Sequence, residues 1–360
     1  MQGNGLTLPS SSGPSRRVPA EQVDPLAGGA ATVSADRPFD VVCFSQHRWE
    51  SNPLRSQQLM SRCATRRRVF FIEEPVYDDT GAAGWRVERK NGRVLVAVPH
   101  LPSRFDTETA ELTLRILLEA LLSEWSVVDP VLWYSTPLAI RYTRELRARA
   151  VAYDCVAPLA PEAPGALAAA AELELLGRAD VVFASSSSLR DAKQALHPRV
   201  HLFPSPVDYY HFGLAQTLGP TSDPLPQAVL PRPRFGYLGR VDARLDFQLL
   251  ASIAERRAYW QIILVGPVAV MDPASLPRAQ NLHYLGPQPY ASLPFFLSGW
   301  DAGLVPFALN DHTRLLSSGK SAAYLSAGCP VLSTPLPDTV YRYGRTAAVR
   351  IAASAATFIE

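Results

Sequence analysis

Arginine, lysine and glycine gather in two segments of the second half of the chain, at spacings that suit the binding of a diphosphate. After a predicted strand, Gly239 permits a ligand to approach the backbone, and Arg240 and Arg244 offer guanidinium groups to phosphate oxygens. Lys320 stands where a helix is expected to begin, and unpaired N–H groups at a helix start attract anions. Only three of the 35 basic residues are lysines, which favours a function for this one. Solvated arginines around a glycine turn are the alternative for the first segment.

Two familiar nucleotide-binding motifs are incomplete in this chain. The run SSGKS contains the last residues of a P-loop, but that motif requires a glycine five positions before Gly319, where Arg314 stands. The first strand is followed by FSQHRWE in place of the G-x-G-x-x-G turn of dinucleotide-binding domains. The sequence therefore excludes a P-loop ATPase and a Rossmann dehydrogenase.

Polar and aromatic residues also follow strands of the first half. His47, Trp49 and Arg55 come just after the first predicted strand, and Asp154 lies at the end of another. Because ligands of open parallel sheets bind beyond the carboxyl ends of the strands, these residues are candidates for the acceptor side of a cleft between two domains. A surface histidine and an aspartate that caps a turn are the structural alternatives.

Short β-branched or aromatic runs alternate with segments of helical period from Phe39 onward, a pattern typical of parallel sheets with crossover helices. We predict an α/β protein with two consecutive Rossmann-like, doubly wound domains. The predicted strands are 39–45, 68–74, 93–99, 130–135, 150–155, 179–185, 200–204, 234–239, 261–266, 281–286, 300–307, 329–334 and 347–352. The predicted helices of the first half are 56–65, 107–124, 139–148, 164–177 and 187–196.

Composition shifts mark the domain boundaries. Residues 1–36 are rich in Gly, Ser, Pro and Ala and predict a disordered tail. Five prolines interrupt every period just after residue 213, so we predict a first domain over 37–213, a linker over 214–233 and a second domain over 234–360.

Charge and cysteine usage narrow the partners and the setting. A net charge of +2 is too small for a nucleic-acid-binding protein, and no zinc-finger spacing accompanies it. The four cysteines are far apart, which predicts a reduced, cytoplasmic setting. Arg141, Arg144 and Arg147 recur at helical spacing, which leaves peripheral contact with anionic lipid at the inner face of the membrane open as a second setting beside the cytoplasm.

The order of motifs over roughly residues 39–350 resembles the bacterial glycosyltransferase family 1 group, which has the GT-B fold and includes enzymes related to teichuronic acid and exopolysaccharide biosynthesis. The motifs that carry the resemblance are RSQQLMSR (55–62), AYDC (152–155), ELELLGRADVVFASSSSL (172–189), HLFPSPVDYYHF (201–212), GYLGRVDARLD (236–246), LVGPV (264–268), LPRAQNLHYLG (276–286) and GKSAAYLSAGCPVLSTP (319–335).

The resemblance implies a retaining, metal-independent transfer of a sugar from a nucleotide sugar, commonly a uridine diphosphate (UDP) sugar, to a hydroxyl of a glycan or lipid-linked acceptor. No further cofactor is implied. The second domain would hold the donor, with Arg240 and Lys320 neutralising the departing diphosphate. The expected donor contacts are Gly239, Arg244, Gly266, Leu285, Gly286, Ser321 and Tyr324, and the expected acceptor-side residues are His47, Trp49, Arg55 and Asp154.

Three departures from the group's pattern keep a second function open. Ala323 replaces a glutamate that would hold the donor ribose, and Ala157 and Pro158 replace acidic residues after the AYDC motif. The group also continues into C-terminal helices beyond the point where this chain stops. The alternative is a catalytically impaired relative that binds a nucleotide sugar or acts as a partner of another glycan-synthesis enzyme.

Overall fold

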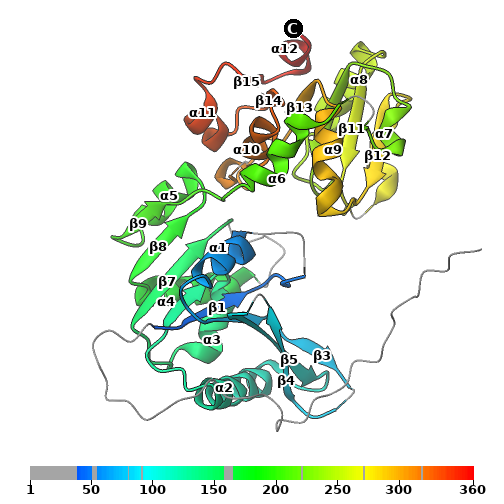
Figure 1. Cartoon of the computed structure of the whole chain (residues 1–360). Helices are drawn as coiled ribbons and strands as arrows, with labels where there is room; N and C mark the ends of the chain where they lie inside the picture. Colours follow the sequence, from blue (N-terminus) through cyan, green and yellow to red (C-terminus); the bar gives the residue numbers. More distant parts are fainter. Residues whose placement is uncertain are drawn as a thin grey trace, which may run out of the picture.

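The computed structural model describes residues 39–50, 55–79, 81–90, 92–157, 165–219, 222–270, 272–317 and 319–360. The predicted tail, 1–36, lies outside these residues. The described chain forms two α/β lobes, each built on its own sheet, as Figure 1 shows. The α/β prediction is therefore confirmed.

The sheet of the first lobe has the strand order β3-β5-β2-β1-β6-β7-β8-β9, with β4 antiparallel to β5 and all other pairs parallel. All seven strands predicted for this lobe are present. Two more, β3 and β4, were missed because they lie at the sheet edge and carry few apolar residues. The strands are β1 (Val41–Ser45), β2 (Val69–Glu73), β3 (Val76–Asp78), β4 (Gly84–Lys90), β5 (Val94–Pro102), β6 (Val131–Tyr134), β7 (Ala150–Cys155), β8 (Val181–Ala184) and β9 (Val200–Leu202).

Helices cover both faces of this sheet. On one face, Met60 packs with buried strand residues such as Cys43 and Phe71, and on the other Leu118, Ile140 and Leu175 join the larger core. The third helix is shorter than predicted. The helices are α1 (Arg55–Cys63), α2 (Thr107–Glu124), α3 (Ile140–Thr143), α4 (Gly165–Arg178) and α5 (Ser187–Gln194).

The early end of α3 has a side-chain cause. The Arg178 guanidinium donates hydrogen bonds to the carbonyl oxygens of Thr143, at 3.0 Å, and of Arg144 and Leu146. These carbonyls would otherwise be unpaired at a helix end, so the arginine stabilises a turn where the sequence predicted further helix.

The second sheet is fully parallel, in the order β12-β11-β10-β13-β14-β15, which is the 3-2-1-4-5-6 order of doubly wound folds. All six predicted strands are present. They are β10 (Arg234–Leu238), β11 (Gln261–Val265), β12 (Leu282–Gly286), β13 (Ala302–Val305), β14 (Val331–Ser333) and β15 (Val349–Ile351). The helices around them are α8 (Phe247–Arg256), α9 (Leu293–Ser298), α10 (Gly319–Ser326), α11 (Pro337–Tyr343) and α12 (Ala355–Ile359).

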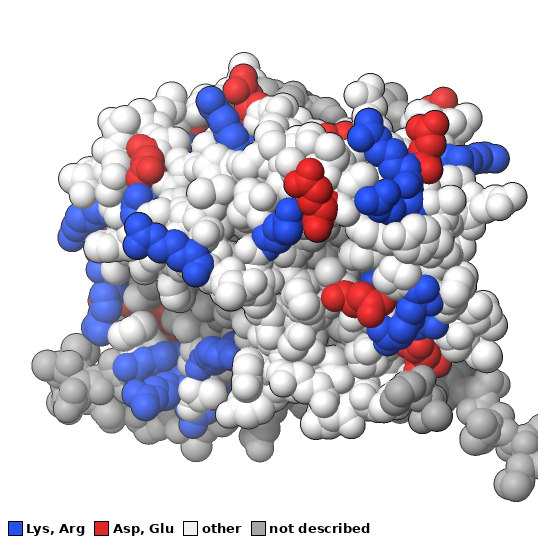
Figure 2. Space-filling view, turned by 90° about the horizontal axis from the view of Figure 1, so that it is seen from above, with Lys and Arg blue, Asp and Glu red and all other residues white. Residues whose placement is uncertain are grey.

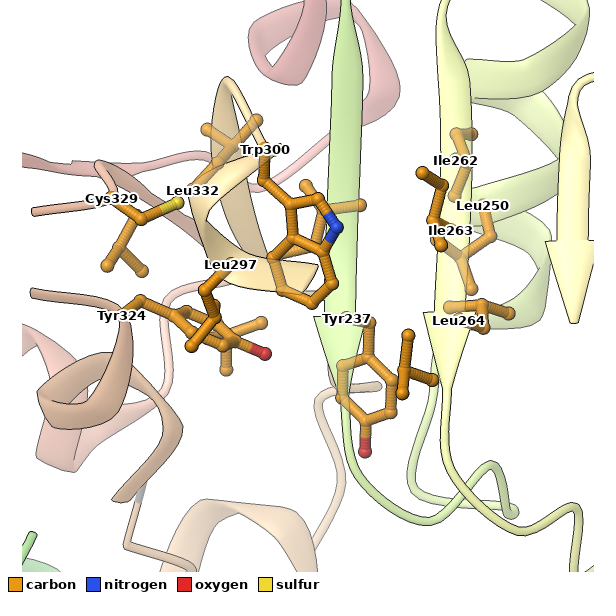
Figure 3. Packing of buried hydrophobic residues seen from close by; sticks show 14 of the residues in the cluster. Tyr237, Leu250, Ile262, Ile263, Leu264, Leu297, Trp300, Tyr324, Cys329 and Leu332 are labelled. Atoms are coloured by element: carbon orange, nitrogen blue, oxygen red, sulfur yellow. The ribbon is translucent and has the colours of Figure 1, made fainter. Parts of the chain in front are cut away.

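Aromatic side chains fill the core between this sheet and its helices. Figure 3 shows Trp300 and Tyr324 beside β10, with Tyr237 near its carboxyl end. Gly236 makes room for Trp300, since an added Cβ would lie 2.0 Å from the indole ring. This packing holds β10 in place and so fixes the position at which the following loop begins.

The boundary between the lobes lies earlier than predicted. Phe212 and Ala215 belong to the core of the second lobe, and the His211 ring stacks on Tyr290 at 4.0 Å. Gln227 is buried and accepts a hydrogen bond from Trp300 Nε1 at 2.7 Å. Residues 209–213, assigned to the first domain, and much of the expected linker therefore pack on the second lobe through α6 (Tyr209–Gly213) and α7 (Leu225–Ala228).

The two lobes touch at a hydrogen-bonded contact around Asp338 of α11. Its carboxylate accepts from the Ser187 backbone N–H at 3.0 Å and from Ser317 Oγ at 3.2 Å. Ser186 Oγ donates to the Leu315 carbonyl at 2.6 Å. Because Ser186 and Ser187 lie at the start of α5, this contact orients the first lobe against the second.

Surface charge does not gather as the arginine spacing predicted. Arg141 pairs with Glu111 at 2.5 Å and Arg144 with Glu174 at 3.1 Å, so the expected basic stripe is largely neutralised. Figure 2, which views the molecule from the side of the second lobe, shows Lys and Arg mixed with Asp and Glu over much of that face, with several basic residues close together at the left. Among the described residues, no helix combines the length and apolar character that a membrane span requires.

Candidate functional site

The order of the second sheet reverses between β10 and β13, and ligands of doubly wound sheets bind beyond the strand ends at such a point. Residues 239–244 follow β10 directly, and Phe307 follows β13. Lys320, in the first turn of α10, reaches the same place from the other side. Lys320 and the loop that carries Arg240 and Arg244 therefore lie at the same strand end.

Glycines lock the ends of three neighbouring strands. Gly239 has φ +148° and Gly266 has φ +146°, which side chains rarely adopt, and an added Cβ at Gly266 would lie 2.0 Å from the Gly239 oxygen. The Gly239 N–H donates to the Val265 carbonyl at 2.8 Å, and the Gly266 N–H donates to the Gly286 carbonyl at 2.9 Å. The three predicted glycines therefore lie side by side.

The ammonium group of Lys320 sits between two aromatic rings, 5.4 Å from the Tyr237 centroid and 5.6 Å from the Phe307 centroid. Burial of the ammonium group, and second the charge of Arg244, lower the pKa of Lys320 to about 8. No carboxylate pairs with it among the described residues. Removing a cation from water without giving it a counter-ion costs free energy, so this arrangement is typical of an anion-binding site.

The two arginines of the loop differ in their contacts and exposure. Arg244 is held by Asp242, with Nε–Oδ1 at 2.8 Å and Nη2–Oδ2 at 2.6 Å. Arg240 is exposed, and its carbonyl accepts a hydrogen bond from the Tyr237 hydroxyl at 2.9 Å. The side chains at this strand end carry a net charge of +2, because Arg240, Arg244 and Lys320 are positive and Asp242 is negative.

Other predicted donor contacts lie deeper than expected. Tyr324 is fully buried, and its hydroxyl accepts a hydrogen bond from the Leu238 N–H at 2.8 Å, so this residue holds β10 in place and is not at the surface of the site. Ser321 is also buried, and Leu285 packs against the core. Ala323 is only 7% exposed and belongs to the same hydrophobic cluster.

An apolar pocket of about 640 Å³ adjoins the glycine-bearing strand ends. Its lining includes Val268, Leu276 and Tyr284, with Arg278 among them. Val268 pairs with Val241, the residue after Arg240, in a short parallel bridge. This bridge connects one wall of the pocket to the basic loop.

In the first lobe, His47 is the predicted residue that lies near this loop. Burial, and second the positive charge of Arg240, lower the pKa of His47 below its usual value. The His47 N–H donates to Ser45 Oγ at 3.1 Å, which fixes the turn after β1. The histidine is exposed and lies within electrostatic range of Arg240 in the other lobe.

The remaining acceptor-side predictions need correction. Trp49 packs edge-to-face on Phe71 in the core, with ring centroids 4.9 Å apart, and is 5% exposed. Arg55 forms a buried, bidentate pair with Asp154, with Nε–Oδ2 at 3.0 Å and Nη2–Oδ1 at 2.7 Å. Trp49 therefore packs in the core, and Arg55 and Asp154 hold each other inside the lobe, although Arg55 Nη1 has no acceptor among the described residues.

Sequence reasoning missed a second pocket of about 470 Å³ at the strand ends of the first lobe. Its polar lining includes Glu73, Glu74, Glu111 and Arg141. The consecutive glutamates that end the predicted strand 68–74 were a signal for it. The others come from distant helices and could not be joined to it by spacing.

Comparison with known proteins adds a curated relative. No protein-family model matches the chain. The Bacillus subtilis (strain 168) protein named "Putative teichuronic acid biosynthesis glycosyltransferase TuaH" is 29% identical over 178 residues, 47% of this chain and 44% of that protein. The chain thus spans less than half of this relative's length. The match agrees with the resemblance drawn from the motifs.

Solved structures resemble nearly the whole chain. The α,α-trehalose-phosphate synthase (UDP-forming) of Burkholderia vietnamiensis has a TM-score of 0.65 at 13% identity, covering 89% of this chain and 90% of that one. The Burkholderia xenovorans enzyme in complex with glucose-6-phosphate has 0.64 at 11%, with the same coverage of 89% and 90%. Anabaena HepE in complex with UDP and glucose has 0.62 at 13%, covering 89% and 87%. This likeness, with two doubly wound lobes, shows that the chain has the GT-B fold.

Proposed function

We propose that the chain is a glycosyltransferase that moves a sugar from a UDP-sugar to a hydroxyl acceptor in the synthesis of a cell-envelope or exopolysaccharide glycan. The observation that carries the proposal is the Lys320 ammonium, which no carboxylate of the described residues pairs with, next to the loop of Arg240 and Arg244 at the switch point of the second sheet. The name of the B. subtilis relative and the complex of HepE with UDP and glucose support the same chemistry.

The basic residues would act on the leaving group. In the transfer, the bond from the sugar's anomeric carbon to the diphosphate oxygen breaks, and a bond to the acceptor oxygen forms. Negative charge grows on the diphosphate, where Lys320 and the exposed Arg240 stabilise it. The acceptor proton passes to the departing diphosphate. We propose that these side chains supply the neutralisation without a metal ion, with retention at the anomeric carbon.

The neighbouring features complete a donor site. The apolar pocket beside Val268 would take the uracil ring, and the strand-end glycines would let the ribose and diphosphate lie against the backbone. His47, neutral and close to Arg240, would accept or donate a hydrogen bond to the transferred sugar from the opposite lobe.

Release of nucleoside diphosphate from a panel of nucleotide sugars tests this function. We expect turnover with a UDP-sugar, and Arg240→Gln should lower kcat by about 10²–10³-fold, the loss typical of one group that stabilises developing charge. Arg345→Gln, which removes an exposed arginine from another part of the second lobe, serves as the matched control and should leave kcat unchanged. Equal rates in the two variants would contradict the assignment of Arg240.

The impaired relative remains the second candidate, because Ala323 lies in the hydrophobic cluster where the related group has a carboxylate. Calorimetry separates the two functions. UDP binding together with turnover supports the transferase, whereas UDP binding without turnover of any nucleotide sugar in the panel supports the binding protein.

Gly239→Ala should disrupt the donor site through the backbone. An added Cβ would lie 2.7 Å from Lys320 Cε and 2.8 Å from Nζ, at a φ of +148° that disfavours any side chain. We expect UDP affinity to fall about tenfold or more and the melting temperature to fall as well. Gly81→Ala is the control, since nothing lies within 4 Å of its added Cβ. An unchanged UDP dissociation constant in Gly239→Ala would contradict the proposal that the diphosphate lies against the backbone at Gly239.

A further inference from the structure

The pocket of the first lobe lies at that lobe's own switch point. Strand order reverses between β1 and β6, and the pocket is lined by Ser45 at the end of β1 and Thr136 just after β6. Its volume of about 470 Å³ is within the range of small-molecule sites, roughly 300–1,000 Å³. Helices α2 and α3, which Figure 1 shows below the sheet of this lobe, supply other walls.

A short hydrogen-bonded turn connects this pocket with the donor side. Ser45 Oγ accepts a hydrogen bond from the His47 N–H at 3.1 Å. The positive charge of Arg240 in the second lobe helps to lower the pKa of His47. The pocket and His47 therefore both lie at the carboxyl end of β1.

The lining carries more negative than positive charge. Glu73, Glu74 and Glu111 contribute three carboxylates and Arg141 one guanidinium, a net charge of −2. Arg48, which pairs with Glu73 at 2.9 Å, reduces this to −1 when it is counted. Arg141 is already paired with Glu111, so the pocket has no surplus cation.

Two polar groups are left for a ligand. The Glu74 side chain has neither an ion pair nor a hydrogen bond to any described residue, and burial raises its pKa although Arg48 opposes this. Arg141 Nη1 is buried and has no acceptor among the described residues. Phe105, Leu114 and Leu138 provide apolar surface between them. A hydrogen-bond acceptor, a donor and apolar walls match the hydroxyls and C–H faces of a sugar ring.

We infer that this pocket binds the acceptor sugar, and that it selects an uncharged sugar over a phosphorylated or carboxylated one. The identification as the acceptor site rests on the proposed transferase function. The charge selection follows from the lining, because a phosphate monoester brings a charge of about −1.5 to −2 into a site that is already negative. In this respect the chain would differ from the B. xenovorans enzyme, whose structure is described with glucose-6-phosphate.

Ligand-observed NMR titration of the whole protein tests the selection by binding alone. The uncharged probes are the methyl glycosides of glucose, galactose, mannose and N-acetylglucosamine, and the anionic probes are the 6-phosphates of all four and the uronic acids of the first three. We expect at least one uncharged glycoside to bind about tenfold or more tightly than its anionic counterparts. Equal or tighter binding of the anionic probes, or binding of none of the probes, would overturn the inference.

Variants assign the selection to this pocket. Glu74→Gln should weaken the uncharged glycoside about tenfold, because a charged acceptor for its hydroxyls is lost. Glu111→Gln should strengthen the anionic probes about tenfold by releasing Arg141. Glu119→Gln, at an exposed position on the same helix as Glu111, is the matched control and should change neither. If Glu74→Gln binds like the control, the pocket is not the site.

UDP binding, measured by calorimetry on the same samples, tests the transferase function separately from the acceptor pocket. A protein that fails to bind UDP contradicts the transferase, whatever the NMR titration shows. A protein that binds UDP but prefers the anionic sugars contradicts the acceptor inference alone.

Discussion

Replacing Lys320 with methionine is expected to lower nucleotide-sugar turnover by about 10³-fold while raising the thermal stability of the protein. The loss of turnover follows from removing the lysine that we propose to face the diphosphate. The gain in stability follows from removing a desolvated charge that has no carboxylate partner among the described residues. A methionine of similar length would pack against the Tyr237 and Phe307 rings that now flank the ammonium group.

The pH dependence of this stability gain has a definite sign. The pKa of Lys320 is about 8 in the folded protein, below the ordinary value of 10.5. Between these values the unfolded chain binds more protons than the folded protein, so the free energy of unfolding of the wild type rises with pH. We therefore expect the variant's higher melting temperature to be clearest at pH 7 and to shrink from pH 8 to pH 10. Differential scanning calorimetry across this range measures it.

A second lysine provides the control for this experiment. Lys193 forms an ion pair with Glu172 at 2.7 Å, and both side chains are 12% exposed. Lys193→Met leaves the mostly buried Glu172 carboxylate without its cation, so the melting temperature should fall while turnover stays close to the wild type. If Lys320→Met also lost stability, the lysine would be a structural residue and the donor site would lack its central cation.

Strand prediction succeeded where a sequence signal was local. The buried parallel strands read as continuous apolar runs, such as QIILV of β11, and crossover helices separate them. The edge strand β4, GWRVERK, is mostly exposed and polar, and therefore carried no such signal. The boundary near residue 213 was misplaced because proline marks breaks in regular structure but does not tell which core a segment joins, as Phe212 shows.

The candidate site was predicted only in part for a similar reason. Glycines at strand ends and a scarce lysine were readable, because the doubly wound topology brings all strand ends to one edge. The sequence did not show which of these side chains are buried. Trp49 and Tyr324 are residue types that often contact ligands, but both pack in cores. The acidic pocket was missed because Glu111 and Arg141 meet through two separate helices.

Asp154→Asn is expected to destabilise the first lobe strongly. The substitution leaves the Arg55 guanidinium buried without a counter-ion, and its side chain is only 4% exposed. Breaking such a pair costs about 3–5 kcal/mol, which at roughly 2–4 °C per kcal/mol predicts a melting temperature lower by about 6–20 °C. The exposed pair of Asp129 with Arg149 offers the control, and Asp129→Asn should change stability by less than about 1 kcal/mol.

Replacing both members of the pair should restore most of this loss. Burial raises the pKa of Asp154 even though Arg55 opposes the shift, so the attraction does not fully offset the desolvation of the carboxylate. The double variant Arg55→Leu and Asp154→Leu removes both charges from the interior and should melt near the wild type. A double-mutant cycle would give the coupling between them. Should Asp154→Asn instead keep its melting temperature and lose only sugar transfer, the pair would act on the acceptor and its role in building the lobe would be refuted.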